Sequence, residues 1–159
     1  MTETPDLEQN PIIAKIRGWR SEAIAGLVSF RGELTVVVPR EHIRAIAEFM
    51  ISDADLKFNF LSDLSAMDRF PIEPRFELNY HLLSLSRRDT ICLRVRVAGE
   101  DPVVESVVSV WPTANWQERE IFDLFGVRFN GHPNLKRIML PDDWEGFPLR
   151  KDYPVEGPR

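Results

Sequence analysis

Two stretches of alternating apolar and polar residues constrain the fold of this chain most strongly. Apolar side chains occupy every second position in both stretches: Phe76, Leu78, Tyr80 and Leu82 in the first, and Ile91, Leu93, Val95 and Val97 in the second. Neighbouring side chains on a strand point to opposite faces, so this period predicts two strands of a sheet with one buried face and one polar face. The run 87–89, Arg-Arg-Asp, indicates a tight hairpin connection between them.

Other local patterns predict the elements around these strands. They indicate a helical turn at 12–19, a strand pair at 24–31 and 34–38, a helix at 40–53 and a strand candidate at 57–60, whose alternation breaks at Leu61. A short helix at 103–111 is expected next. A later helix follows, with Thr113 or Asn115 as its N-cap and Gly126 as its C-cap. Beyond Val127 we expect little regular structure.

Consecutive strands with short connections and a few helices indicate an α+β fold, with a mainly antiparallel sheet and packed helices. An extended C-terminal segment is expected to follow this domain. We divide the chain into a flexible N-terminal lead at 1–10, an α+β domain at 11–126 and a partner-binding segment at 127–159.

Composition favours a single globular domain in a reducing compartment. A chain of 159 residues suffices for one domain with a sizeable core. The net charge of −5 argues against nucleic-acid binding. The single cysteine, Cys92, excludes an internal disulfide and a cysteine-rich metal site, and its place in an alternating run favours a small buried apolar residue. With no signal-like, transit-like or membrane-spanning stretch, we expect a bacterial cytoplasmic protein that reaches a membrane only through a partner.

Residues 116–154 combine aromatic residues, glycine, proline and charges of both signs. The aromatic residues are Trp116, Phe122, Phe125, Phe129, Trp144, Phe147 and Tyr153. Aromatic and Arg side chains on a constrained backbone are typical of contact surfaces between proteins. The basic pair Arg150-Lys151 is either a solvated patch or an interface anchor, and the dense aromatic residues around it favour the anchor.

A charged cluster on the late helix allows two interpretations. Glu118, Glu120, Asp123 and His132 are possible metal ligands, but a catalytic site usually has three protein ligands in a defined pocket. The alternative is pairing of the carboxylates with nearby basic residues, namely Arg119, Arg128, Lys136 and Arg137. His42 and His81 are interpreted as structural or solvated. The sequence shows no nucleophile beside His132, no P-loop, no GxGxxG and no cysteine cluster.

The same run resembles the signature of one family. The matching residues are Glu118, Arg119, Glu120, Asp123, Leu124, Phe125, His132, Lys136, Ile138 and Met139, followed by DDWEGFPLRKDYP at 142–154. They resemble the C subunit of respiratory complex I, which is a small hydrophilic protein. Phe147 stands where His is often found in that family, and Met139 where Leu is more usual.

The resemblance implies a non-catalytic subunit in the peripheral arm of a proton-translocating NADH:quinone oxidoreductase. Such a protein packs against the large D subunit, which helps to form the quinone site, and lies near the B and I subunits. It holds no cofactor, since other subunits bind FMN, the iron–sulfur clusters and quinone. It is peripheral, at the cytoplasmic face of the bacterial cell membrane.

We expect the partner interface to include charged and aromatic residues from the matching run. They are Glu118, Arg119, Glu120, Asp123, His132, Lys136, Arg137, Trp144, Phe147, Arg150, Lys151, Asp152 and Tyr153. Two alternatives stay open at this point. One is a homologous subunit of a membrane-bound hydrogenase or another quinone-reducing complex. The other is an independent metal-dependent hydrolase that uses Glu118, Glu120, Asp123 and His132.

Overall fold

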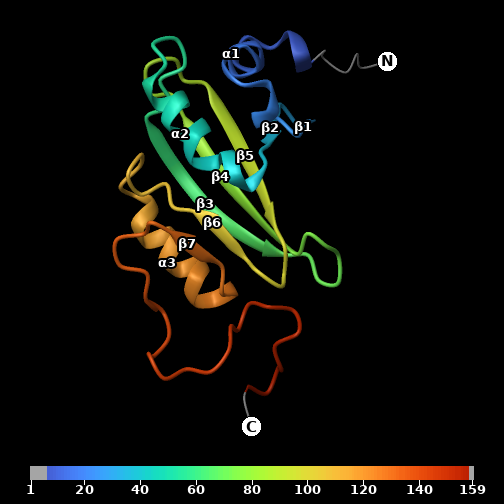
Figure 1. The fold of residues 1–159 in the computed structure, drawn as a ribbon, viewed down its shortest axis with the longest axis vertical. Coiled ribbons are helices and arrows are strands. Elements are labelled where there is room, and N and C mark those ends of the chain that lie inside the picture. The colour runs from blue at the N-terminus through green and yellow to red at the C-terminus, as the bar shows by residue number, and fades with distance from the viewer. Residues whose placement is uncertain (1–6, 158–159) are drawn as a thin grey trace.

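The computed structural model of the chain describes residues 7–157 and builds them around a five-stranded sheet (Figure 1). Its strands are β1 (Gly26–Phe30), β2 (Glu33–Val37), β3 (Phe60–Asp68), β4 (Phe76–Leu83) and β5 (Thr90–Val97). Their order across the sheet is β1-β2-β5-β4-β3, and only the pair β2–β5 is parallel. The predicted α+β fold with a mainly antiparallel sheet is therefore confirmed.

The strand register explains how the alternation produces one apolar face. Val36, Leu93, Tyr80 and Leu64 form a row across four strands, and all four are buried. The next row is Thr35, Cys92, His81 and Asp63. Because the pleat turns successive side chains to opposite sides, this second row lies on the other, more polar face.

Three α-helices within the described residues accompany the sheet: α1 (Pro11–Trp19), α2 (Ile43–Ser52) and α3 (Ala114–Phe125). α1 begins where the Asn10 side chain accepts a hydrogen bond from the N–H of Ile12 (2.9 Å), and Pro11 suits the first helical position. α2 buries Ile43, Ile46, Ala47 and Met50 at helical spacing. Gly126 ends α3 with φ of 77°, as predicted. Thr113 is the N-cap residue, although its side chain makes no capping hydrogen bond.

One prediction for the second half of the chain was wrong. Residues 103–111 form no helix, because Val103–Glu105 is a strand, β6. β6 pairs in parallel with β7 (Arg128–Asn130), the one strand in residues 127–157, so the expectation of little regular structure beyond Val127 is confirmed there. Val104 and Phe129 are buried in the main core. Strands of three residues are too short to show a period, and this pairing joins segments about 25 residues apart in the chain.

The prediction of a strand at 57–60 was also wrong in its bounds. β3 begins at Phe60 and continues to Asp68, with a bulge between Leu61 and Asp63. The bulge lets Leu61 and Leu64 both face the core, at 3% and 4% exposure. The alternation of Phe58 with Phe60 does not continue into the strand, because Phe60 is 41% exposed while the next residue, Leu61, is buried.

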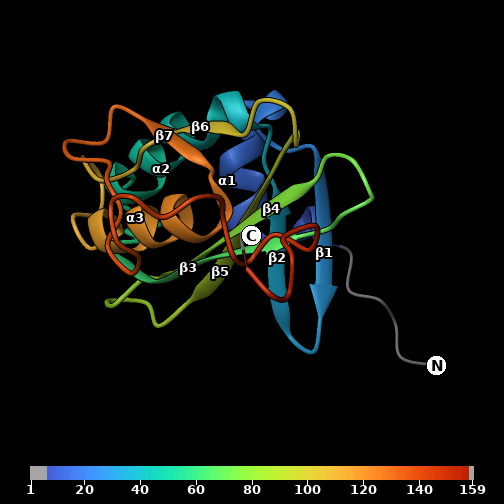
Figure 2. The ribbon, with the colours of Figure 1, turned by 90° about the horizontal axis from the view of Figure 1, so that it is seen from below.

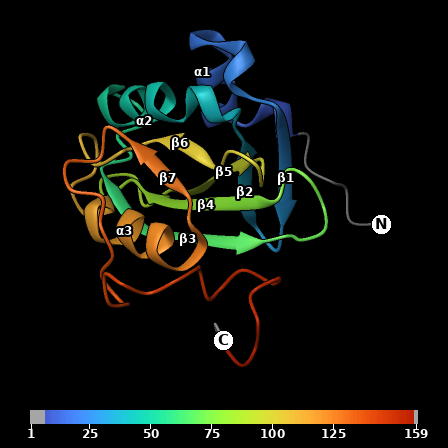
Figure 3. The same ribbon diagram turned by 60° about the horizontal axis from the view of Figure 1, so that its bottom comes forward.

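Figures 2 and 3 show α1, α2 and the β6–β7 pair over one face of the sheet, with α3 beside β3.

Residues 1–6 of the expected flexible lead lie outside the described residues, while Leu7–Gln9 form a 3-10 turn. Residues 131–157, named here the C-terminal segment, contain turns and bends but no helix or strand. None of the helices in residues 7–157 is long and apolar enough to cross a membrane. The division of the chain at residue 126 stays a prediction.

Candidate functional site

Asp123 on α3 holds the first part of the C-terminal segment. Its fully buried carboxylate accepts hydrogen bonds from Arg137 Nη1 (2.7 Å) and from the N–H groups of Ile138, Met139 and Leu140 (3.0, 2.6 and 2.9 Å). Burial by itself would raise the pKa of Asp123, but these donors outweigh it and lower the pKa. The predicted pairing of Asp123 with Arg137 is confirmed, and it lies inside the chain.

Two arginines bond the backbone of the same segment. Arg137 Nη2 donates to the carbonyl oxygens of Trp144 and Gly146, both at 3.0 Å. Arg119 donates to the carbonyl oxygens of Lys136 (3.1 Å) and Arg137 (3.2 Å). Backbone carbonyls outside helices and sheets still need partners, and the planar guanidinium offers several donors in a fixed geometry. These two side chains therefore define the path of a segment that has no secondary structure.

Arg75 joins the end of the C-terminal segment to the sheet. It donates two hydrogen bonds to Asp68 (2.9 and 2.8 Å) and two to Asp152 (3.0 and 2.7 Å). Asp68 also accepts the N–H of Lys151 at 2.8 Å. Hydrogen bonds from Arg75 hold the pKa values of both carboxyl groups below their usual range. The sequence alone did not indicate Arg75 or Asp68, because Asp152 is 77 residues from Arg75 and Lys151 is 83 residues from Asp68.

Arg150 is bound within the chain rather than left free for a partner. Its Nε donates to the carbonyl oxygen of Phe125 (2.6 Å). Its guanidinium lies over the rings of Phe147 and Phe76, 4.7 and 5.1 Å from their centroids. Burial and the neighbouring charge of Arg75 lower the pKa of Arg150. Gly126 permits this approach, because a Cβ at that position would lie 2.6 Å from Arg150 and 2.7 Å from Phe147.

Glu118 is a second fully buried carboxyl group on α3. It accepts hydrogen bonds from the Ser106 hydroxyl (2.6 Å) and the Val107 N–H (2.8 Å), so it connects α3 to the turn after β6. No arginine or lysine of the described residues pairs with it in an ion pair. Burial raises the pKa of Glu118 to about 7, although both hydrogen bonds oppose the rise.

The raised pKa of Glu118 predicts a particular pH dependence of stability. Between about pH 4.5, its usual value, and about pH 7 the folded chain binds more protons than the unfolded chain. The free energy of unfolding should therefore fall as pH rises through this window, by up to about 3 kcal/mol, and then level off. Urea unfolding at several pH values measures the slope. Glu118→Gln should remove this contribution, and an unchanged slope in that variant would contradict the prediction.

The remaining predicted interface residues differ in how much of their surface is free. His132 is half-buried, with Nε2 at 3.0 Å from the carbonyl oxygen of Asn115. Phe147 and Tyr153 are half-buried, and Arg119 is buried. The exposed members of the predicted set are Glu120, Lys136, Trp144, Lys151 and Asp152. Their role in binding a partner stays a prediction, whereas Glu118 and Asp123 contact only residues of their own chain.

A group of exposed apolar side chains lies on α3 and the C-terminal segment. The group, named here the apolar surface, consists of Trp116, Met139, Trp144 and Leu149, which are 62%, 63%, 37% and 51% exposed. Leu149 borders a pocket of about 230 Å³ between α3 and the edge strand β3, with Glu120 also on its lining. Exposed apolar side chains on this segment are therefore candidates for contact with a partner.

The metal-site interpretation of the α3 cluster finds no support in this geometry. Glu118 bonds to Ser106 and Val107, and Asp123 bonds to Arg137 and three N–H groups. The two carboxylates are thus turned to different partners. Among residues 7–157, the one group of three potential ligands close enough for a metal ion is Glu33, His81 and Cys92, elsewhere in the fold.

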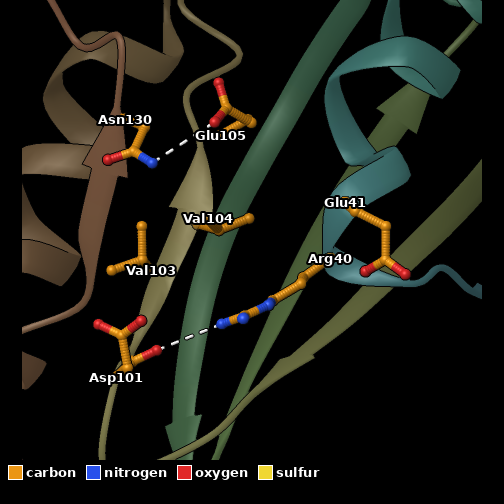
Figure 4. A pocket seen from close by; sticks show the side chains of 7 residues that line it. All are labelled: Arg40, Glu41, Asp101, Val103, Val104, Glu105 and Asn130. Carbon is orange, nitrogen blue, oxygen red and sulfur yellow. Dashed lines mark hydrogen bonds between the residues drawn. The ribbon is translucent and has the colours of Figure 1, made fainter.

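A further surface pocket of about 290 Å³ lies between the 3-10 turn Arg40–His42 and the strands β6 and β7 (Figure 4). Arg40 donates to the carbonyl oxygen of Asp101 (3.3 Å), and Asn130 donates to Glu105 (3.5 Å). Both hydrogen bonds are exposed and long, so they hold the polar side chains of the lining only weakly in place. We assign this pocket no function.

Comparison with known proteins identifies the family. The family model described as "Respiratory-chain NADH dehydrogenase, 30 Kd subunit" matches residues 36–159. The chain belongs to this 30 kDa subunit family. The C subunit of NADH-quinone oxidoreductase from Roseiflexus sp. (strain RS-1) is 47% identical over 149 residues, which cover 94% of this chain and 86% of that protein. The corresponding C subunit from Geotalea uraniireducens is 41% identical over 151 residues, covering 95% and 91%.

Two solved structures share the fold of this member of the 30 kDa subunit family. A trypsin-resistant fragment (1-134) of Nqo5 is 32% identical, with a TM-score of 0.66, and the match covers 78% of this chain and 98% of the fragment. A chain of the membrane-bound sulfane sulfur reductase, an archaeal respiratory membrane complex, is 26% identical, with a TM-score of 0.75 and coverage of 91% and 84%. The resemblance inferred from residues 116–154 is thus confirmed.

Proposed function

We propose that the chain is the C subunit of a proton-translocating NADH:quinone oxidoreductase and positions the large D subunit, which helps to form the quinone site. The C-terminal segment carries this proposal. Partly buried hydrogen bonds to Asp123, Arg75 and Arg119 fix its path, while Trp144 and Leu149 remain exposed upon it. A rigid segment that displays apolar side chains loses little conformational freedom on binding, which is what a scaffold requires.

The proposed scaffold protein has no catalytic residue and no flavin, iron–sulfur cluster or quinone of its own, since other subunits hold these groups. The bonds of two carboxylates on α3 support a structural role: Glu118 bonds Ser106, and Asp123 bonds Arg137. The B and I subunits are proposed as further neighbours in the peripheral arm. The complex would keep the chain at the cytoplasmic face of the bacterial membrane.

A second function is favoured by the structural match to the sulfane sulfur reductase complex. That chain has the higher TM-score of the two, 0.75 against 0.66. A chain with this fold therefore occurs in another respiratory membrane complex, and we keep a membrane-bound hydrogenase or another quinone-reducing complex as the alternative. The identities of 47% and 41% to subunits of NADH-quinone oxidoreductases favour the NADH enzyme here.

Loss of the apolar surface should weaken assembly without unfolding the chain. We expect the double variant Trp144→Ala/Leu149→Ala to bind the D subunit about 30-fold more weakly, which corresponds to a loss of about 1 kcal/mol for each truncated apolar side chain. Affinity purification of the tagged chain from solubilised membranes of its host, with quantitative mass spectrometry, measures the recovered subunits. Co-purification of flavin and iron–sulfur subunits would support the NADH enzyme, and a nickel–iron hydrogenase set would support the second function.

The matched control is Val28→Ala/Phe30→Ala, which removes two exposed apolar side chains from β1. This variant should recover the D subunit as the wild type does. Equal loss in both double variants, or none in either, would contradict the role of the apolar surface.

A further inference from the structure

Three potential metal ligands meet on the polar face of the sheet, at the opposite end of β4 from Arg75. Glu33 on β2, His81 on β4 and Cys92 on β5 each offer one ligand atom, and these atoms lie within 4.8 Å of one another. Nothing in the proposed scaffold role uses them. We propose that Glu33, His81 and Cys92 bind a zinc ion that joins three strands of the sheet.

The strand register brings the three side chains together. His81 and Cys92 are direct partners across the antiparallel pair β4–β5. Cys92 is also the partner of Thr35 across the parallel pair β2–β5. Glu33 precedes Thr35 by two positions, so it lies on the same face of β2. The three residues share no motif spacing in the sequence, because the strands that carry them are ordered differently in the sheet and in the chain.

The separations of the ligand atoms suit a small tetrahedral ion. His81 Nδ1 is 3.1 Å from Glu33 Oε1, and Cys92 Sγ lies within the 4.8 Å limit of both. Zinc bonds of about 2.0–2.3 Å place tetrahedral ligand atoms roughly 3.3–3.8 Å apart. Small rotations of the two exposed side chains, Glu33 and His81, therefore suffice to close the site around an ion.

The mixed donor set favours zinc over hard cations. One thiolate, one imidazole and one carboxylate are ligands that Zn²⁺ accepts, whereas Mg²⁺ and Ca²⁺ prefer oxygen ligands only. A pocket of about 400 Å³ is lined by Glu33 and His81 together with Arg31, Ser62 and Thr90. Three protein ligands leave the fourth position for water or another small ligand from this pocket.

The surroundings of Cys92 fit a ligand that is shielded from solvent. The side chain is 2% exposed, and its thiol lies 3.8 Å from the Asn79 amide oxygen as a weak donor. Burial raises the pKa of Cys92 to about 11, so the ion must displace a proton when it binds. The competing explanation is an exposed Glu33–His81 pair above an unreactive buried thiol.

Metal binding to the full chain tests the proposal. The purified chain, stripped with a chelator, is equilibrated with Zn²⁺ or, as a control ion, Mg²⁺, and the bound metal is measured by mass spectrometry. We expect one Zn²⁺ per chain, no Mg²⁺, and a higher midpoint of thermal unfolding with Zn²⁺. Loss of an outer partner of a metal ligand already costs about 10–100-fold in affinity, so Cys92→Ser and His81→Ala should each weaken binding by roughly 100-fold or more.

Two further variants keep the test decisive. Glu33→Gln changes a half-exposed side chain in the hairpin, so it should fold normally and still weaken binding. His42→Ala removes a histidine outside the cluster and should bind Zn²⁺ like the wild type. With Co²⁺ in place of Zn²⁺, the wild type should show thiolate-to-cobalt absorption that Cys92→Ser lacks. Absence of binding by the wild type, or equal binding by all variants, would overturn the proposal.

Discussion

Asp123→Ala is expected to lower the free energy of unfolding by about 3–5 kcal/mol. The substitution leaves the half-buried Arg137 guanidinium without its carboxylate, and three backbone N–H groups lose their acceptor. Removing one partner of a buried ion pair has costs of this size, because the remaining charge stays desolvated. Urea unfolding of the purified chain at neutral pH measures the change.

Asp101→Ala is the matched control for Asp123. Asp101 pairs with Arg128 at 2.7 Å, but both side chains are more than half exposed. Exposed pairs contribute about 0–1 kcal/mol, so this variant should unfold close to the wild type. A stability of Asp123→Ala within about 1 kcal/mol of the wild type would show that the segment does not depend on this carboxylate.

Arg75→Ala is expected to destabilise the chain by a similar amount, about 3–5 kcal/mol, and to loosen the end of the C-terminal segment. The variant leaves Asp68, whose side chain is 1% exposed, without its guanidinium partner. It also removes both hydrogen bonds that hold Asp152. Urea unfolding measures the first effect. Limited trypsin digestion measures the second, since cleavage after Arg150 and Lys151 should become faster than in the wild type.

Arg44→Ala provides the comparison for Arg75, because Arg44 makes a surface pair with Glu48 one helical turn away on α2 (3.1 Å). Such a pair contributes only a few tenths of a kcal/mol, so both stability and the cleavage rate near the C-terminus should stay unchanged. If trypsin cleaves Arg75→Ala and the wild type equally slowly, Arg75 does not hold the segment in place.

Bonds of Arg150 and Asp123 within the chain change how a loss of assembly in their variants must be interpreted. The sequence suggested that Arg150, Lys151 and the α3 carboxylates meet charges on a partner. In the structure, Arg150 bonds to the carbonyl of Phe125, and Asp123 bonds to Arg137. A variant of either residue would weaken assembly through the altered path of the segment. Variants of exposed Trp144 and Leu149 probe contact with the partner more directly.

The main sheet strands could be predicted because their signal is local. β4 and β5 each hold eight residues with an apolar side chain at every second position. The short strands β6 and β7 and the bulged β3 could not, because their pairing depends on residues distant in the chain or on an inserted residue. Local patterns therefore revealed where strands lie but not the parallel pairing of β2 with β5.

The family could be recognised from residues 116–154, because its signature is a continuous run of residue types. The roles of those residues could not be assigned in the same way. Glu118 and Glu120 differ by two positions, yet one is fully buried and the other exposed. Burial on a helix is decided by what packs against each side, and for Glu118 that neighbour is the turn after β6.

By itself, the sequence determined the α+β class, the end of α3 at Gly126, and the family, since each depends on neighbouring residues. Only the tertiary structure decided which charges bond inside the chain and which side chains stay exposed. Arg75 meets Asp152 across 77 positions, and Glu33, His81 and Cys92 meet on three strands. These ion pairs and ligand groups form only at distances of a few ångströms. Strand order and register decide which distant residues come that close.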